Sequence, residues 1–310
     1  MYFLIFLFLI FIVGLIWFLR PTPASQSEIK EFLIYPEVSS HFKSFRDLEI
    51  HYDQVGKGRD IVLLHGIGAS TFIWRSLMPL LARNFRVTAI DLPGHGRSEK
   101  NLKFNYDLEN VSVYLLDFID SIVIKDYMLI GSSMGALIAL WMLKTRPKNI
   151  SEVICISPPT DHSLIKFYRP LLPLLLPLHF FINRISMKVA VHRAINRSEL
   201  VTRDVVNAYM LPFRDRGEAW QCFLKSVNIL AHPEIPEALK HLNKNDKLRL
   251  KIIHGLSDKV VPKSIPLELK KMLPNAEIEF IENAGHHAFE DHPELIYESI
   301  LKFVNPKEEK

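Results

Sequence analysis

The stretch YMLIGSSMGALIALWML, Tyr127 to Leu143, carries the strongest structural signal in the chain. A run typical of a buried strand enters it, and a run typical of a helix leaves it. Its centre, GSSMG, has the spacing G-x-S-x-G. A serine at the tip of such a sharp turn needs an unfavourable backbone and very small residues two positions away on either side. In this register Ser133 is the candidate nucleophile, and Ser132 fills the space between strand and turn.

The same turn places the Met134 N–H at the start of a helix, where it is free to bind an anion. A second N–H donor is expected from the loop after an earlier strand, and Ile67 in VLLHGIGAS is the candidate. These two groups form the predicted oxyanion hole. The glycine-rich turn DLPGHGRS, Asp91 to Ser98, has neither a P-loop lysine nor G-x-G-x-x-G, so we interpret it as structural support.

A serine hydroxyl is a weak nucleophile at neutral pH unless a base lies beside it. The motif NAGHHAF follows the last predicted strand, and the glycine before His286 lets that loop present the ring, with His287 as the rival base. The orienting acid should lie between serine and histidine in the sequence, at the end of a strand. Asp258 in KIIHGLSDKVVP meets this condition, and Asp161 in SPPTDHS is the rival acid.

From about residue 45 the chain alternates strand-like and helix-like runs, which predicts an α/β fold with a mostly parallel sheet and helices on both faces. Residues 159–245 break this rhythm because they contain helical stretches and no convincing strand. We therefore assign 45–158 and 246–310 to the core, 159–245 to an inserted helical cap, and 21–44 to a linker.

The first residues are unusually apolar. The run YFLIFLFLIFIVGLIWFL, Tyr2 to Leu19, contains no charge and sits at the lower end of the length that spans a bilayer. We predict an N-terminal transmembrane anchor over residues 1–20, with a cleaved signal peptide as the alternative. Basic residues follow the run, which favours a single-pass membrane protein with its domain on the cytoplasmic face.

The composition excludes several classes of function. A net charge of +4 over 310 residues is too mild to imply nucleic-acid binding, and two cysteines support neither a disulfide framework nor a cysteine metal cluster. No metal or organic cofactor is implied. The first half of the cap, Leu164 to Asn196, has basic residues and no acidic one. Two interpretations stay open, a lid that packs on the core and a surface that binds anionic lipid, and one segment can do both.

Five blocks, LLHGIG, IDLPGHGRS, IGSSMGA, HGLSDKVVP and NAGHHAFEDHPE, resemble the successive signatures of the α/β-hydrolase superfamily, in the order serine, acid, histidine. The resemblance implies an eight-stranded sheet with a helical cap inserted between strands 6 and 7. The apolar first run, the Ser-Met-Gly turn and the apolar cap are similar to membrane-anchored monoacylglycerol lipases. The dehalogenases and epoxide hydrolases of the superfamily use an aspartate at this turn, and Ser133 argues against both.

These features predict a serine hydrolase that cleaves carboxylic esters through Ser133, His286 and Asp258, with lipid esters such as monoacylglycerols as substrates. One alternative is hydrolysis of a carbon–carbon bond in a dienoic ketoacid, which similar serine hydrolases perform. The other is a catalytically silent, hydrolase-like domain that binds a ligand or a partner.

Overall fold

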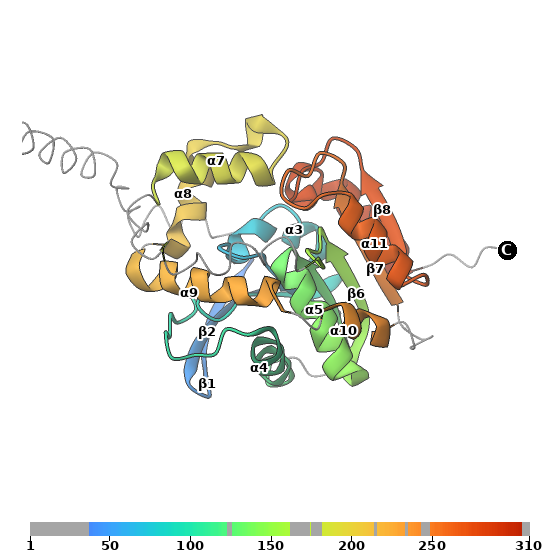
Figure 1. Ribbon diagram of the computed structural model, residues 1–310, viewed down its shortest axis with the longest axis horizontal. Coiled ribbons are helices and arrows are strands. Elements are labelled where there is room, and N and C mark those ends of the chain that lie inside the picture. The colour runs from blue at the N-terminus through green and yellow to red at the C-terminus, as the bar shows by residue number, and fades with distance from the viewer. Residues whose placement is uncertain are drawn as a thin grey trace, which may run out of the picture.

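The computed structural model describes residues 37–122, 126–161, 174, 182–213, 216–232, 235–242 and 249–305. They form a single eight-stranded sheet flanked by helices (Figure 1). The strands are β1 Ser39–Phe45, β2 Leu48–Val55, β3 Arg59–Leu64, β4 Phe85–Ile90, β5 Tyr127–Ser132, β6 Ile150–Ile156, β7 Arg249–Gly255 and β8 Glu277–Ile281. The α-helices are α3 Met78–Leu81, α4 Leu108–Asp120, α5 Met134–Thr145, α7 Arg184–Ala194, α8 Arg203–Met210, α9 Arg216–Leu230, α10 Ile235–Leu242, α11 Ser264–Met272, α12 Ala288–Asp291 and α13 Pro293–Val304.

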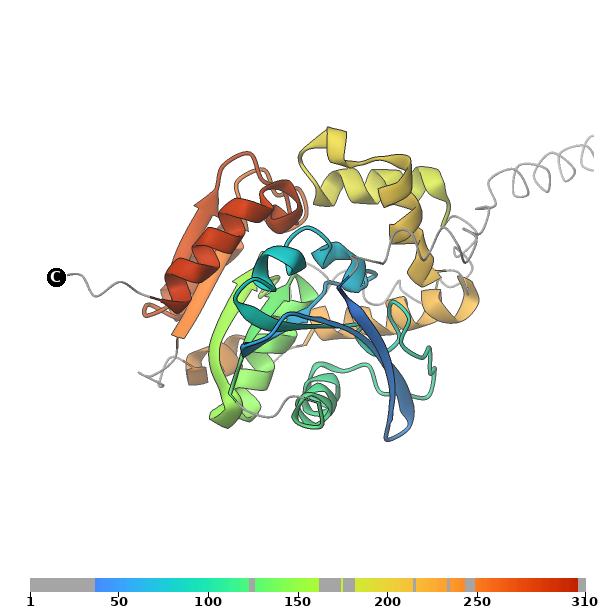
Figure 2. The ribbon, with the colours of Figure 1, turned by 180° about the vertical axis from the view of Figure 1, so that it is seen from behind.

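The strand order is β1-β2-β4-β3-β5-β6-β7-β8. The pairs β1–β2 and β2–β4 are antiparallel, and all the other pairs are parallel. Seen from behind in Figure 2, the blue β1–β2 hairpin lies at one edge of the sheet and the orange-red β7 and β8 lie at the other. This arrangement confirms the predicted α/β-hydrolase fold. The sheet begins at Ser39, inside the segment 21–44 that the sequence suggested was a linker.

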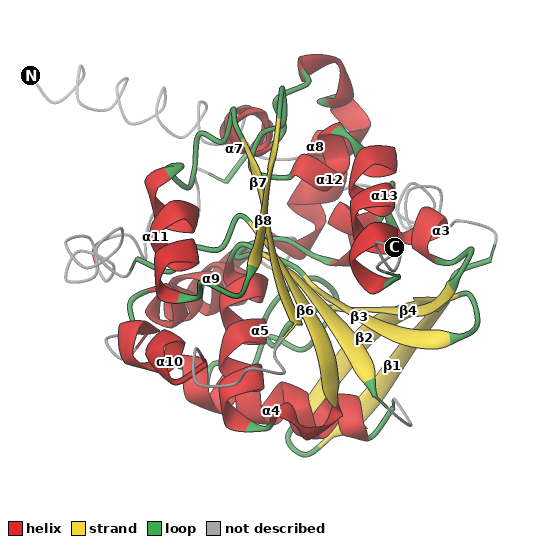
Figure 3. Ribbon diagram, turned by 90° about the vertical axis from the view of Figure 1, so that its right-hand side faces the viewer, coloured by secondary structure: helices red, strands yellow, loops and turns green. Residues whose placement is uncertain are grey.

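The central strands are apolar on both faces because helices cover both faces. Along β3, Val62 and Leu64 belong to one buried cluster, while Ile61 and Leu63 belong to the cluster on the opposite face. This alternation follows from the two-residue repeat of a strand. Figure 3 shows α4, α5 and α10 on one side of the sheet, and α3, α12 and α13 on the other.

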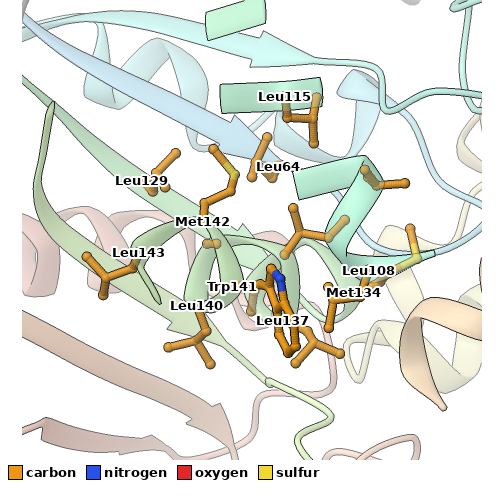
Figure 4. Packing of buried hydrophobic residues seen from close by; sticks show 14 of the residues in the cluster. Leu64, Leu108, Leu115, Leu129, Met134, Leu137, Leu140, Trp141, Met142 and Leu143 are labelled. Atoms are coloured by element: carbon orange, nitrogen blue, oxygen red, sulfur yellow. The ribbon is translucent and has the colours of Figure 1, made fainter. Parts of the chain in front are cut away.

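Helix α5, which follows the serine turn, is buried almost all round. Leu137, Leu140 and Trp141 pack in the same cluster as Leu108 of α4 and Leu129 of β5 (Figure 4). A helix that is apolar on every side is stable only in the interior of a protein. The start of α5, and with it the serine turn, is therefore held in place by packing in the core.

Between β6 and β7, the described residues form helices α7, α8, α9 and α10 and contain no strand. In Figure 1, α7 and α8 stand apart from the helices that flank the sheet. The position of this helical segment between the sixth and seventh strands agrees with the predicted insertion. Its boundaries at residues 159 and 245 stay a prediction.

The prediction of a single-pass membrane protein is corrected. No helix in the described ranges is both long enough and apolar enough to cross a bilayer. The longest of them, α9, is shorter than the roughly 20 residues that a span needs. The run Tyr2–Leu19 and the proposed anchor over residues 1–20 lie outside the described residues. The membrane location and its cytoplasmic orientation are therefore withdrawn.

Candidate active site

Ser133 occupies the sharp turn between β5 and α5. Its backbone has φ 53° and ψ −120°, a left-handed conformation that is strained for a residue with a side chain. The flanking glycines are required by close backbone approach. A Cβ at Gly131 would lie 2.4 Å from the Gly135 carbonyl oxygen, and a Cβ at Gly135 would lie 2.1 Å from that of Leu64. The turn therefore has the geometry that the G-x-S-x-G spacing predicts.

Replacing Gly135 with alanine should destabilise the protein by about 3 kcal/mol or more, because the added methyl group forces α5 away from β3. Urea denaturation measures the change in the free energy of unfolding. Gly217→Ala in α9 is the matched control, since a Cβ there meets nothing within 4 Å. That variant should gain about 0.5–1 kcal/mol. Equal stability of the two variants would contradict the close approach at the turn.

The predicted oxyanion donors lie on either side of Ser133. Met134 is the first residue of α5, so its N–H has no intrahelical acceptor. Ile67 follows β3, the strand directly beside β5 in the sheet. A Cβ at Gly66 would stand 3.1 Å from the Ser133 Cβ, which shows how closely this loop passes the serine. The Ile67 loop and the start of α5 thus both lie next to Ser133.

Asp258 and His286 are brought together by the parallel pair β7 and β8. The His286 Nδ1–H donates to Asp258 Oδ2 over 2.8 Å, and the N–H groups of Val260 and Val261 donate to Asp258 Oδ1 over 2.7 and 2.9 Å. Burial alone would raise the pKa of Asp258, but these hydrogen bonds outweigh it and hold the pKa at about 2. Asp258 is therefore charged and fixes the orientation of the imidazole.

His286 is prepared to act as a base. Burial lowers the pKa of His286 below its ordinary value, and the Asp258 carboxylate offsets this effect only in part. The ring is therefore neutral at neutral pH. With Nδ1 bonded to Asp258, Nε2 is the atom left to accept a proton. Ser133 and His286 line the same cavity, together with Ile67.

The rival residues are placed differently. The Ser132 side chain is fully buried, and its Oγ has no hydrogen-bond partner in the described part of the chain. Asp161 is exposed after β6, and Asp258 is the carboxylate that contacts His286. The Nδ1 of His287 contacts Glu290 Oε1 at 2.9 Å, so it belongs to a separate cluster. The structure therefore favours Ser133, Asp258 and His286 over their rivals.

The cavity beside Ser133 has a volume of about 480 Å³. It lies between the loop after β3 and the helices of the inserted segment. Most of its lining is apolar: Ile67, Ala69, Met187, Ala190, Val191, Phe213, Trp220 and Phe223. Such a lining suits a hydrocarbon group of a substrate. Among the described residues, no group of His, Cys, Asp and Glu is arranged to hold a metal ion.

The turn Asp91–Ser98 supports the site, as its glycine-rich sequence suggested. Asp91 accepts hydrogen bonds from the N–H groups of Thr71 and Arg97 over 2.7 and 2.8 Å, and from His51 Nδ1 over 2.7 Å. Burial opposes the charge of Asp91, but the nearby His51 holds the pKa of this carboxyl below its usual range. Asp91 thereby ties β2 and β4 to the segment that follows the Ile67 loop.

His65 shapes the same loop. The Leu92 N–H donates to His65 Nε2 over 3.0 Å, so Nδ1 carries the hydrogen and donates to the Gly66 carbonyl oxygen over 2.7 Å. Burial lowers the pKa of His65, which keeps the ring in this neutral form. The hydrogen bonds of His65 to Gly66 and Leu92 thus hold the loop that carries the Ile67 N–H.

A buried polar cluster beside the proposed triad was not predicted from the sequence. Tyr209 of α8 donates to Glu290 Oε1, Arg75 pairs with Glu290 Oε2, and His287 Nδ1 lies 2.9 Å from both the Tyr209 hydroxyl and Glu290. These residues come from three distant parts of the chain and share no short motif. The pairing of His287 with Glu290 three residues later is the one local signal that could have indicated it.

Three curated relatives align with most of the chain. The uncharacterized hydrolase YugF of Bacillus subtilis is 30% identical and covers 82% of this chain and 92% of its own. A pimeloyl-[acyl-carrier protein] methyl ester esterase of Vibrio vulnificus is 26% identical, with 83% and 98% covered. A 2-hydroxy-6-oxononadienedioate/2-hydroxy-6-oxononatrienedioate hydrolase of Pseudomonas putida is 24% identical, with 86% and 96% covered.

Among solved structures, the Cif epoxide hydrolase from Acinetobacter nosocomialis superposes with a TM-score of 0.78 at 18% identity, covering 93% of this chain and 99% of that one. This likeness concerns the fold alone. The family model described as "Alpha/beta hydrolase family" matches residues 61–299, which include the serine turn, the acid loop and the histidine loop. With the identity to YugF and the observed sheet, this match shows that the chain belongs to the alpha/beta hydrolase family.

Proposed function

We propose that this hydrolase cleaves carboxylic esters with Ser133 as its nucleophile. One observation supports the proposal above all others. Ser133, on a strained turn, lines the same cavity as His286, whose Nδ1 is bonded to a buried, charged Asp258. A serine, a neutral imidazole and a carboxylate in these roles form the constellation that performs acyl transfer.

In the proposed mechanism, His286 removes the proton from Ser133 as the Oγ attacks the ester carbonyl carbon. The N–H groups of Ile67 and Met134 stabilise the negative charge on the carbonyl oxygen, and each such donor typically contributes about 3 kcal/mol. His286 then gives its proton to the leaving alcohol. Water hydrolyses the acyl-enzyme by the reverse route, and Asp258 stabilises the imidazolium in both steps.

The substrate class is inferred from the cavity and from one relative. An apolar cavity of about 480 Å³ beside the nucleophile suits a medium or long acyl chain. The similar protein of Vibrio vulnificus is a methyl ester esterase whose substrate is carried by an acyl-carrier protein. Both observations favour esters of fatty acyl groups, among them monoacylglycerols.

Carbon–carbon bond hydrolysis is the second candidate, because the similar enzyme of Pseudomonas putida is a hydrolase of 2-hydroxy-6-oxo dienoic acids. Its substrates carry two carboxylates. Lysine and arginine are missing from the described lining of the cavity, and carboxylates buried there would lack a permanently charged partner. The lining therefore favours the ester.

A fluorophosphonate probe tests the proposed function, since it reacts with an activated serine. We expect stoichiometric labelling, and peptide mapping should locate the label on Ser133. Octanoyl and dodecanoyl esters should then be hydrolysed faster than a 2-hydroxy-6-oxo dienoic acid. Failure of the probe to label the folded protein would favour the silent, hydrolase-like binding protein instead.

A further inference from the structure

A second histidine beside the proposed base has its own carboxylate. His287 Nδ1 lies 2.9 Å from Glu290 Oε1, just as His286 Nδ1 lies 2.8 Å from Asp258 Oδ2. The two imidazole rings stack with centroids 5.5 Å apart and planes inclined by 28°. Both rings line the cavity. The proposed mechanism uses His286 and leaves His287 without a role.

The cluster around His287 fixes which ring nitrogen carries the hydrogen. Burial would raise the pKa of Glu290, but Arg75 and the neighbouring hydrogen bonds outweigh it and keep this carboxyl ionised. Burial and the Glu290 charge raise the pKa of Tyr209 well above its ordinary value, so its hydroxyl keeps its proton and donates it to Glu290. An ionised Glu290 is an acceptor only, so His287 Nδ1 carries a hydrogen that points to it.

With Nδ1 turned towards Glu290, the opposite edge of the ring, which holds Nε2, is the edge that can reach the cavity. His287 is 6% exposed, and it lines that cavity. Within the described residues, Nε2 has no hydrogen-bond partner. In a neutral ring this atom is an acceptor. An acceptor that faces the cavity without a protein partner is free to take a hydrogen bond from a group of a bound ligand.

We propose that His287 is a specificity-determining residue that accepts a hydrogen bond from a hydroxyl group on the alcohol portion of the ester. This inference rests on the proposed ester hydrolysis. His286 must reach the leaving alcohol oxygen to protonate it. The stacked ring of His287 is then next to that alcohol, within reach of a hydroxyl on a neighbouring carbon. A polyol monoester is thereby distinguished from a simple alkyl ester of the same acid.

The test compares 1-octanoylglycerol with propyl octanoate, which share the acyl group and the three-carbon alcohol and differ in the two hydroxyls. We expect the wild-type protein to prefer the glycerol ester. His287→Phe keeps an aromatic ring against His286 and Phe289 but removes both nitrogens. In this variant, kcat/KM for the glycerol ester should fall about tenfold more than kcat/KM for propyl octanoate, which lowers the ratio of the two by that factor.

Two further variants complete the design. His287→Gln retains an acceptor and should keep part of the preference. His241→Phe removes an exposed histidine of α10 and should leave the ratio unchanged. An unchanged ratio in His287→Phe, whether or not both activities fall, overturns the inference, because loss of hydroxyl recognition must lower kcat/KM for the glycerol ester more than for propyl octanoate. Failure of the wild-type protein to cleave either ester would instead overturn the proposed ester hydrolysis.

Discussion

Ser133→Ala should lower kcat for ester hydrolysis by about 10⁵-fold or more, the loss typical of removing the nucleophile from a serine–histidine–carboxylate site. The residual rate would come from the oxyanion donors and from substrate binding alone. The fluorophosphonate probe should no longer label the Ser133→Ala variant. Alanine and serine both carry a Cβ, so the backbone strain at φ 53° is the same for the two residues. The free energy of unfolding should therefore change little.

The neighbouring serine provides the control. Ser132→Ala removes a hydroxyl that is buried and has no partner among the described residues, so activity should stay within about threefold of the wild type. Single-turnover hydrolysis of an octanoyl ester separates the chemical step from product release and measures both variants. Full activity in Ser133→Ala, or a loss in Ser132→Ala as large as that in Ser133→Ala, would contradict the assignment of the nucleophile.

Asp258→Asn is expected to lower kcat by about 10⁴-fold, because an amide at this position favours the wrong tautomer of His286 and cannot stabilise the imidazolium.

The same substitution should move the midpoint of the pH profile of kcat/KM to lower pH. Activity needs neutral His286, whose pKa lies below its ordinary value. The kcat/KM of the wild type should therefore rise with pH and reach its plateau before neutral pH. Asp258 raises this pKa, so its loss should move the midpoint to lower pH.

A pH–rate profile of kcat/KM for both proteins, recorded with one octanoyl ester, measures the fall in the plateau and the shift in the midpoint. Asp161→Asn is the matched control, since that carboxylate is exposed and Asp258 is the one that contacts His286. Its profile should overlay that of the wild type. A shift of the Asp258→Asn midpoint to higher pH would contradict the electrostatic role of the carboxylate.

Local sequence signals were sufficient to predict the fold and the candidate triad. The two glycines around Ser133 act through backbone contacts only a few residues away, and Asp258 and His286 each stand where a recognisable strand ends. Adjacent parallel strands then bring these ends together without any need for long-range information. This is why short motifs in the right order specify so much of the site.

Features that depend on distant pairings were missed. The cluster of Tyr209, Glu290 and Arg75 joins segments that lie at least 81 residues apart, and no periodicity or motif links them. Strand β1 was missed for another reason. It is an edge strand with alternating, largely exposed residues, so its composition resembles that of a linker. The membrane prediction rested on the hydropathy of one run and on the charges beside it, and these do not establish where a segment lies in the folded chain.

The sheet order also bears on when the protein becomes active as it folds. Strands β6 and β7 pair directly, although residues 157–248 separate them in the chain. Pairing across such a sequence separation is slow because the ends of a long segment must first meet. The proposed nucleophile Ser133 and the proposed donors Ile67 and Met134 belong to the part of the chain that is synthesised first, whereas Asp258 and His286 follow only with β7 and β8. A newly made chain therefore carries the proposed nucleophile without the proposed base until the last strands are in place.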